Sequence, residues 1–400
     1  MPVHREYRHG KGEGLTAVSP REMHMNWIAR HRIGWTCALA VLSTVLVLST
    51  YRALRNARDR STILRLTENM HAVCVGRFLI DLPADAQIDV RSRFVGGFDI
   101  ESSDNETEEE FDTRFNDLES QVVAVSDGGR SRRLETPKVF GVDGARGKVV
   151  VYDRQRGETL EGGHLAEIED VSVKGILRIK ELSVMASATH RPLDVGKRLE
   201  QMLGQIRPLN AREIPFEEGF CIDRAIVRDP FEHKGNESIV LVAGLPGHRD
   251  VNIVFSSNAG ATPVPGLLER HEKNRARHPI LMRLAFKYLR QRLRTINGLT
   301  GDELVTQVRE SNLTTGYSFH WEMAGKQNDL YAPHLLLELE SGVNPVAGGD
   351  PVQSTLSQEA MLDLWERIVS SIRVRRPETV EPLSPDPPAE SLPRVQRTES

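Results

Sequence analysis

Three short stretches contain residue types that enzymes use, but none has the spacing that the chemistry requires. His271-Glu272 begins like the zinc-binding H-E-x-x-H motif, yet no histidine stands four residues after His271. No G-x-S-x-G is present that would expose a nucleophilic serine at a strand-to-helix turn. The stretch GVDGARGK at residues 141–148 is similar to a phosphate-binding loop, but five residues separate Gly141 from Gly147, and Val149 stands where Ser or Thr would contact magnesium. We therefore predict no catalytic residue and no cofactor.

The histidines give no pattern of metal ligands. The thirteen histidines are scattered along the chain, and lone histidines are mostly surface or structural residues. Four of them could converge in the second half of the chain, although their spacing does not recommend them as ligands: His233, His248, His320 and His334. We predict no metal site.

Three cysteines in the whole chain exclude a disulfide-rich scaffold and a cysteine-based zinc module. Cys74 and Cys221 open two similar segments, CVGRFLIDLP and CIDRAIVRDP. Two interpretations are open: a disulfide between the halves in an oxidising compartment, or one small buried apolar side chain in each half. We favour the second, because a duplicated fold is expected to place the two cysteines in separate cores.

Two stretches are strongly charged. Residues 101–119 contain nine carboxylates and a single cation, Arg114, whereas residues 270–294 contain nine Lys or Arg and only one carboxylate, Glu272. The basic stretch could bind nucleic acid, anionic phospholipid or a protein partner. It could equally be a solvated helix face, which is the usual use of such runs.

The composition indicates a globular protein of more than one domain. The chain has 400 residues, of which 39% are hydrophobic, and a formal net charge of −4. That length exceeds one ordinary core, and the small net charge excludes a general affinity for polyanions.

One apolar run predicts a membrane anchor. Residues 33–51 contain no charge, and as a helix of about 1.5 Å per residue they would span roughly 28 Å, the thickness of the bilayer core. No small-residue cleavage site follows, so we expect an uncleaved signal anchor rather than a removed signal peptide. Residues 1–32 form a basic N-terminal segment, and the proline-rich residues 377–400 are expected to be disordered. The flanking arginines slightly favour a cytoplasmic body, a weak indication for a long domain.

Between these ends the chain is duplicated. The segments at Cys74 and Cys221 match at an offset of 147, and VDGARGKVVV matches INGLTGDELV at 154. Two amphipathic helical stripes, which end at Ile206 and Ile372, match at 166. The growing offset indicates insertions in the second copy, which surface loops tolerate.

Each copy contains strand patterns followed by a closing helix. A capping box at Thr107-x-x-Glu110 predicts a middle helix in the first copy, and residues 267–294 predict one in the second, interrupted by Pro279. We therefore expect an α+β fold of two similar lobes, each a mainly antiparallel sheet packed with helices, at residues 70–210 and 213–376.

Four segments resemble a known family: CVGRFLIDLPADA, GFCID, APHLLLELESG and LWERIVSSIRVR. They are similar to the immunity proteins that neutralise type VI secretion lipase effectors of the fourth class. These segments are structural, so the resemblance transfers no active-site or contact residue.

The resemblance implies a noncatalytic inhibitor that binds a cognate phospholipase effector and stops it from opening at a membrane. It also implies a periplasmic body behind a single-pass inner-membrane anchor, against the flanking charges. The alternatives are a membrane-anchored enzyme with an unrecognised site, or an envelope module that binds anionic lipid through the basic stretch.

Overall fold

The computed structural model describes residues 20–104, 106–124, 134–142, 144–230, 237–277, 279 and 283–375. The chain divides into two compact units, Met1–Arg60 and Ser61–Ser400. Helix α1 (Pro20–Glu68) runs through the first unit into the start of the second, and its side chains are described from Leu42 onward.

The predicted anchor, residues 33–51, belongs to α1, and the side chains of its first half lie outside the described residues. Within the described part of the chain, no helix has a stretch long and apolar enough to cross a bilayer. Residues 1–19 and the predicted tail, residues 377–400, also lie outside the described residues.

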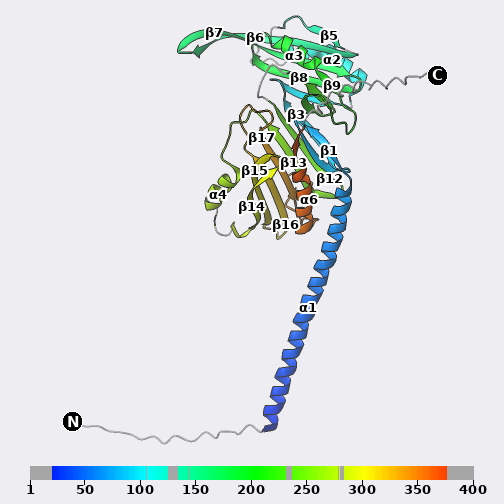
Figure 1. Ribbon diagram of the computed structural model, residues 1–400, viewed down its shortest axis with the longest axis vertical. Coiled ribbons are helices and arrows are strands. Elements are labelled where there is room, and N and C mark those ends of the chain that lie inside the picture. Colours follow the sequence, from blue (N-terminus) through cyan, green and yellow to red (C-terminus); the bar gives the residue numbers. More distant parts are fainter. Residues whose placement is uncertain are drawn as a thin grey trace, which may run out of the picture. The chain divides into compact units, whose positions relative to one another are not determined.

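The elements of the second unit occur twice in the same order (Figure 1). The first series is β1 (Met70–Val75), β2 (Phe78–Pro83), β3 (Gln87–Phe94), β4 (Asp99–Ser103), α2 (Glu108–Ala124), β5 (Lys138–Val142), β6 (Ala145–Glu161), β7 (His164–Ile179), β8 (Leu182–Arg191), α3 (Val195–Gly204) and β9 (Ile206–Pro208). The second is β10 (Gly219–Ile222), β11 (Ala225–Arg228), β12 (Ser238–Leu245), β13 (His248–Asn258), α4 (Leu267–Arg277), β14 (Phe286–Ile296), β15 (Leu299–Arg309), β16 (Thr315–Met323), β17 (His334–Ser341), α6 (Gln358–Ser371) and β18 (Arg373–Val374).

The two large sheets have equivalent strand orders. The first is β4-β8-β7-β6-β5, and the second contains β13-β17-β16-β15-β14 and continues through β12 to β3. Every strand pair in the described residues is antiparallel. The expected α+β class with mainly antiparallel sheets is therefore confirmed.

The two copies exchange strands. Strand β3 of the first copy pairs with its counterpart β12 and so extends the second sheet. In the small sheets, β18 of the second copy pairs with β2, and β9 of the first copy pairs with β11. The sheets are therefore not confined to the predicted segments 70–210 and 213–376, and one continuous core of buried apolar residues includes both copies.

The preferred interpretation of the cysteines is wrong. Cys74 and Cys221 form a disulfide with Cα atoms 5.9 Å apart, and Gly76 exchanges both backbone hydrogen bonds with Cys221. The strand exchange is the physical reason: it brings the equivalent first strands of the two copies together, so equivalent residues meet instead of lying in separate cores.

A buried ionic contact reinforces this junction. Arg77, 3% exposed, follows β1 and donates to Asp229 at 2.7 Å and to Glu237 at 2.6 Å, both from the second copy. Removing one partner of such a buried group would leave an uncompensated charge, which is far more costly than losing a surface ion pair.

The helices confirm one sequence prediction and correct another. Thr107 and Glu110 form the predicted capping box of α2, with the Glu110 amide donating to the Thr107 hydroxyl at 3.2 Å and the Thr107 amide donating to the Glu110 carboxylate at 2.8 Å. The second middle helix is shorter than expected, because α4 ends at Arg277 and residues 286–296 form β14. In β14 successive side chains point to opposite faces of the sheet, which is a period of two. The prediction of a helix did not consider this period for residues 286–296.

Candidate partner-binding surface

Within the described residues, no group of three or more His, Cys, Asp or Glu side chains could hold a metal ion. The candidate histidines have separate partners. His248 contacts Thr355, His320 contacts Ser318 and His334 lies 3.4 Å from Glu322. His233 lies outside the described residues.

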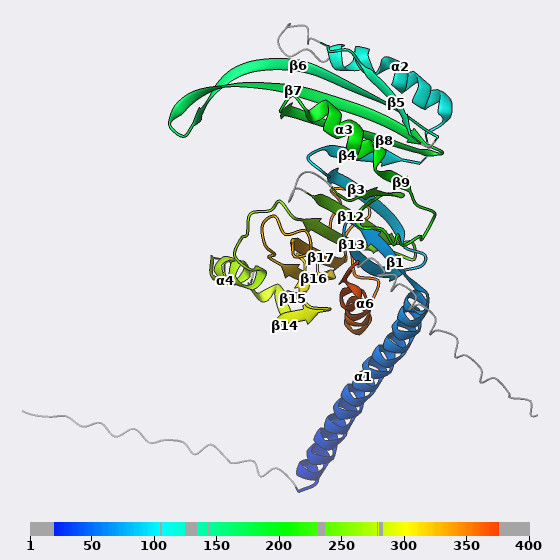
Figure 2. The same ribbon diagram turned by 45° about the horizontal axis from the view of Figure 1, so that its top comes forward.

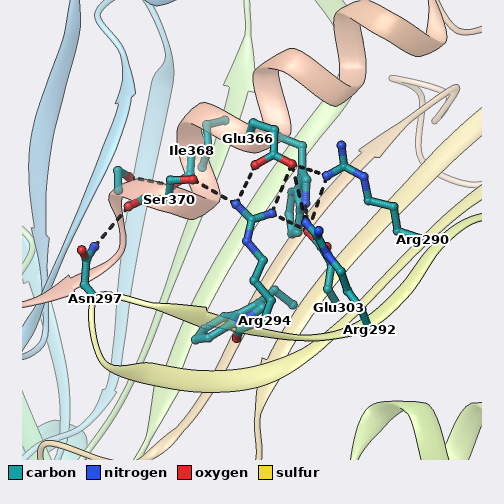
Figure 3. Close-up of polar contacts among 11 residues, drawn as sticks. Arg290, Arg292, Arg294, Asn297, Glu303, Glu366, Ile368 and Ser370 are labelled. Carbon is teal, nitrogen blue, oxygen red and sulfur yellow. Dashed lines mark hydrogen bonds and ion pairs between the residues drawn. The ribbon is translucent and has the colours of Figure 1, made fainter.

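Four of the nine basic residues in the stretch 270–294 pair with carboxylates from elsewhere in the chain. We call one part of it the β14 arginine cluster: Arg290, Arg292, Arg294, Glu303 and Glu366. The three arginines alternate along β14 and therefore share one face of the sheet, toward α6 (Figure 3). Glu303 comes from the neighbouring strand β15 and Glu366 from α6.

The β14 arginine cluster is closely paired. Glu303 is fully buried and accepts from Arg292 at 2.5 Å, from Arg294 at 2.5 Å and from the indole of Trp365 at 2.7 Å. Glu366 accepts from Arg294 at 2.6 Å and from Arg290. Burial alone would raise the pKa of Glu303, but these donors outweigh it and lower that pKa. These arginines hold β14 against α6, so they are not a free cationic surface.

The basic residues on α4 are also engaged. Arg270 binds Glu322 through two hydrogen bonds of 2.8 and 2.6 Å, and Lys273 lies 3.6 Å from Glu269. His271 packs edge-on against Tyr288 of β14, with ring centroids 5.0 Å apart. Arg270 and His271 of this helix are therefore engaged by residues of the neighbouring strands.

The acidic stretch at residues 101–119 is matched in the same way. Lys148 from β6 lies 2.9 Å from Glu119, and Arg114 lies 2.5 Å from Glu106. Arg146, from the same strand as Lys148, pairs with Asp112. Both charged stretches singled out in the sequence thus contain several residues that are paired within the fold.

A different element projects from the first sheet. Residues 155–161 of β6 and 164–170 of β7 pair with each other, beyond the last pairs that β7 makes with β8. We call these residues, 155–170, the β6–β7 ribbon; Figure 2 shows it curving past the end of the sheet. At about 3.3 Å per residue, it reaches roughly 20 Å beyond its neighbours.

Backbone irregularities mark the point where the ribbon leaves the sheet. The register shifts between Tyr152 and Gln155 in β6 and between Val171 and Val173 in β7. Asp153, inside the first of these bulges, has φ 56°. Bulges bend a strand and increase its twist, so they account for the curvature of the ribbon.

The tip of the ribbon is a two-residue turn. Gly162 and Gly163 have φ of 59° and 88°, and they lie between the paired residues Glu161 and His164. A turn of this type needs positive φ at both central residues, which glycine adopts without a steric penalty. The turn thereby fixes which residues face each other across the ribbon.

The ribbon carries exposed apolar and acidic side chains. Leu160 and Leu165 face each other across the strands and are 72% and 71% exposed. The next pair on the same face is Glu158 opposite Glu167, for which the described residues offer no cationic partner. This element therefore combines exposed apolar side chains with neighbouring like charges.

Two cavities lie near the base of the first copy. One, of about 740 Å³, lies between α3 and β5, and the other, of about 620 Å³, is lined by the β7–β8 turn and residues 207–213. In the second cavity Arg224 is 3.2 Å from Asp104. Neither gathers the nucleophile, base and oxyanion donors that catalysis requires.

Sequence reasoning missed the ribbon as a functional candidate, although a signal was available. Gly162-Gly163 separates GETLE from HLAEIE, and two glycines between such runs are a hairpin signal. Only the structure reveals that the strands on either side outrun their neighbours.

Comparisons with known proteins agree with the architecture. The family described as the Tle cognate immunity protein 4 N-terminal domain matches residues 71–155, and the corresponding C-terminal domain matches residues 213–377. No match was found among the curated proteins.

Solved structures share the fold. The immunity protein TplEi of the type VI secretion system of Pseudomonas aeruginosa, complexed with a peptide named "L", is 23% identical with a TM-score of 0.57, over 77% of this chain and 98% of its own. A crystal structure of a Tle4–Tli4 complex contains a chain that is 24% identical with a TM-score of 0.59, over 78% and 98%. With more than half of its residues matched by the two family domains in their expected order, the chain belongs to the Tle cognate immunity protein 4 family.

Proposed function

We propose that this protein binds a cognate type VI secretion phospholipase effector and inhibits it in the periplasm, by clamping the closed form of the enzyme and blocking its activation at the membrane. The observation that carries the proposal is the match of both family domains over both copies. Proteins of this family inhibit effectors rather than catalyse reactions, so the alternative of an anchored enzyme is wrong.

The mechanism follows from the energetics of a lid. A lipase becomes active when a lid opens and exposes apolar surface to lipid. An inhibitor that prefers the closed form by about 4 kcal/mol lowers the open population roughly a thousandfold. A duplicated body that presents surfaces from two copies is suited to bind both sides of a closed enzyme. The solved Tle4–Tli4 structure, which contains a chain of the same fold, is a complex of two proteins.

Two features support a periplasmic body on an inner-membrane anchor at residues 33–51. The Cys74–Cys221 disulfide is typical of an oxidising compartment and rare in the cytosol. Apolar side chains on successive turns of α1 are exposed, including Leu42, Leu46 and Leu48, and such a surface requires a nonaqueous environment or a partner. Tethering would raise the concentration of the inhibitor near the membrane under attack.

The mechanism can be tested with two substrates. The cognate lipase would be assayed on a monomeric soluble ester and on phospholipid vesicles, each with and without the full chain. A clamp on the closed form predicts a much larger loss of vesicle hydrolysis than of ester hydrolysis. Equal loss on both substrates would instead indicate a blocked active site and would overturn the lid mechanism.

Location needs its own experiment. A reporter enzyme that is active only in the periplasm, fused after Ser400 at the end of the full chain, should be active in the cells that carry it. Activity confined to a cytoplasmic reporter at the same position would contradict the proposed orientation.

A further inference from the structure

The β6–β7 ribbon contributes little to the fold that it projects from. Its strands pair with each other alone over residues 155–170, and a two-stranded ribbon buries too little apolar surface to be stable by itself. The leucines at its tip are not part of either buried apolar cluster. The apolar contacts that would stabilise the ribbon are therefore absent within the described part of this chain, and a binding partner could supply them.

The apolar contact available at the tip is specific in place and size. Leu160 and Leu165 lie directly opposite each other, so both side chains stand on one face of the ribbon. With 72% and 71% of each side chain exposed, they form a small hydrophobic knob. A knob of this size fits a pocket in a partner rather than a flat surface, because burial on several sides is what makes an anchor residue effective.

The charges beside the leucines indicate the chemistry of that pocket. Glu158 and Glu167 face each other one pair away on the same face, and like charges in that position destabilise a ribbon. Residues 155–170 contain five carboxylates and only one cation, Arg156, which already lies 3.2 Å from Glu169. The acidic excess repels anionic lipid and a second copy of the same ribbon, and it attracts Lys or Arg.

We propose that the β6–β7 ribbon is an effector-docking element, in which Leu160 and Leu165 enter an apolar pocket of the lipase while Glu158 and Glu167 pair with Lys or Arg side chains at the rim of that pocket. This inference rests on the proposed function and adds to it the contact residues on this chain and the chemistry of the opposing surface. It separates two roles: the leucines determine how slowly the complex dissociates, and the carboxylates how quickly it forms.

The role of the leucines is tested by replacing both side chains with alanine in the full-length protein. The double variant Leu160→Ala/Leu165→Ala should bind the cognate lipase about a hundredfold more weakly, roughly tenfold for each buried leucine, mainly through faster dissociation. The matched control is Leu293→Ala, which removes an equally exposed leucine, 72%, from β14, and it should bind like the wild type. Thermal unfolding of all three proteins checks that the body is intact.

A second variant removes the ribbon altogether. Residues 156–169 are replaced by Asn-Gly, which joins the directly paired residues Gln155 and Asp170 through a two-residue hairpin turn. This variant should show at least the same loss of affinity as the double alanine variant. Retention of wild-type affinity by either protein would overturn the assignment.

The carboxylates are tested by salt. Wild-type association should slow as ionic strength rises, and Glu158→Gln/Glu167→Gln should associate several-fold more slowly at low salt with a flatter salt dependence. An unchanged salt dependence would overturn the basic rim.

These binding experiments also separate a failure of the proposed function from a failure of the docking role of the ribbon. If wild-type protein fails to bind the lipase, the proposed function fails together with this inference. If wild-type protein binds and the ribbon variants bind equally well, only the docking role of the ribbon is wrong.

Discussion

The β14 arginine cluster and the β6–β7 ribbon both present charge on strands at the periphery of the protein, yet they use it in opposite ways. In the cluster, three arginines converge on Glu303 and Glu366, with Glu303 completely buried beneath them. In the ribbon, Glu158 faces Glu167 beside two exposed leucines. The difference teaches that charge density alone does not identify a binding surface, because charge can be matched inside the fold; for this reason we place the proposed docking element where charge has no internal partner within the described residues.

The two regions should differ in how substitutions change the free energy of unfolding and the affinity for the effector. Groups that are matched inside the body should cost stability when removed and leave effector binding unaffected unless the body itself unfolds. Groups on the ribbon should do the reverse. The expected effects on the free energy of unfolding range from several kcal/mol in the body to less than about 0.5 kcal/mol at the tip of the ribbon.

The largest effect is expected from removing the disulfide. Cys74→Ala/Cys221→Ala opens a cross-link over 147 residues, and closing such a long loop stabilises a fold by about 5 kcal/mol through loss of unfolded-state entropy. Urea unfolding with and without a reducing agent measures it. Wild-type protein under reducing conditions should match the variant, and a midpoint unaffected by either change would contradict a structural role for the bond.

The β14 arginine cluster should come next. Glu303→Ala leaves Arg292 and Arg294 without their buried carboxylate, and we expect a loss of about 3 kcal/mol. Glu303→Gln retains the acceptor oxygen and should lose less. The control is Glu158→Ala on the ribbon, which should change the free energy of unfolding by less than about 0.5 kcal/mol. Equal losses in the two glutamate-to-alanine variants would remove the distinction between the regions.

Acid should reveal the matched carboxylates. Burial alone would raise the pKa of Glu322, but hydrogen bonds from His334 and Arg270 lower it to about 2, against an ordinary value of 4.5. Because the folded value is the lower one, this carboxylate stabilises the protein above pH 4.5, and its contribution is lost as pH falls from 4.5 toward 2.

Glu322→Gln should therefore be less stable than wild type at pH 7, and the gap should narrow at pH 3. Urea unfolding at both values gives the answer. Glu167→Gln serves as the exposed control, and its free energy of unfolding at pH 7 should stay within about 0.5 kcal/mol of wild type. A gap for Glu322→Gln that stays constant between the two values would show that ionisation is not what this residue contributes.

The smallest effect on stability is expected at the tip of the ribbon. Leu160→Ala/Leu165→Ala removes side chains that belong to neither buried cluster. The free energy of unfolding should therefore stay within about 0.5 kcal/mol of the wild-type value. A substantially larger loss would mean that the leucines stabilise the body, and the two regions would then differ only in degree.

Much of the fold could be predicted from local patterns. The capping box at Thr107, the closing helices and the alternating strands are signals within a few residues of each other, and each copy repeats them. The exchange of β9 and β18 could not be predicted, because no local pattern records which hairpin a terminal strand joins. For that reason the favoured interpretation of Cys74 and Cys221 as separate buried residues is wrong: the argument from duplication holds for separate lobes and fails for interlocked ones.

The functional surface was harder to predict for a related reason. Arg290 and Glu366 are 76 residues apart in sequence, so the basic stretch looked unmatched until the fold brought its carboxylates to it. Leu160 and Leu165 looked like ordinary strand residues, since exposure depends on where the neighbouring strands β5 and β8 end. A sequence records charge and periodicity, whereas the presence or absence of a partner is a property of the folded chain.

The most direct test of the account is a titration of vesicle hydrolysis. The cognate lipase would be incubated with increasing full-length protein and then given phospholipid vesicles, with released fatty acid as the readout. We predict that hydrolysis falls to below about a hundredth of its initial rate near one inhibitor per lipase, and that Leu160→Ala/Leu165→Ala shifts the curve to higher concentration. Undiminished hydrolysis at a large excess of wild-type protein would contradict the account.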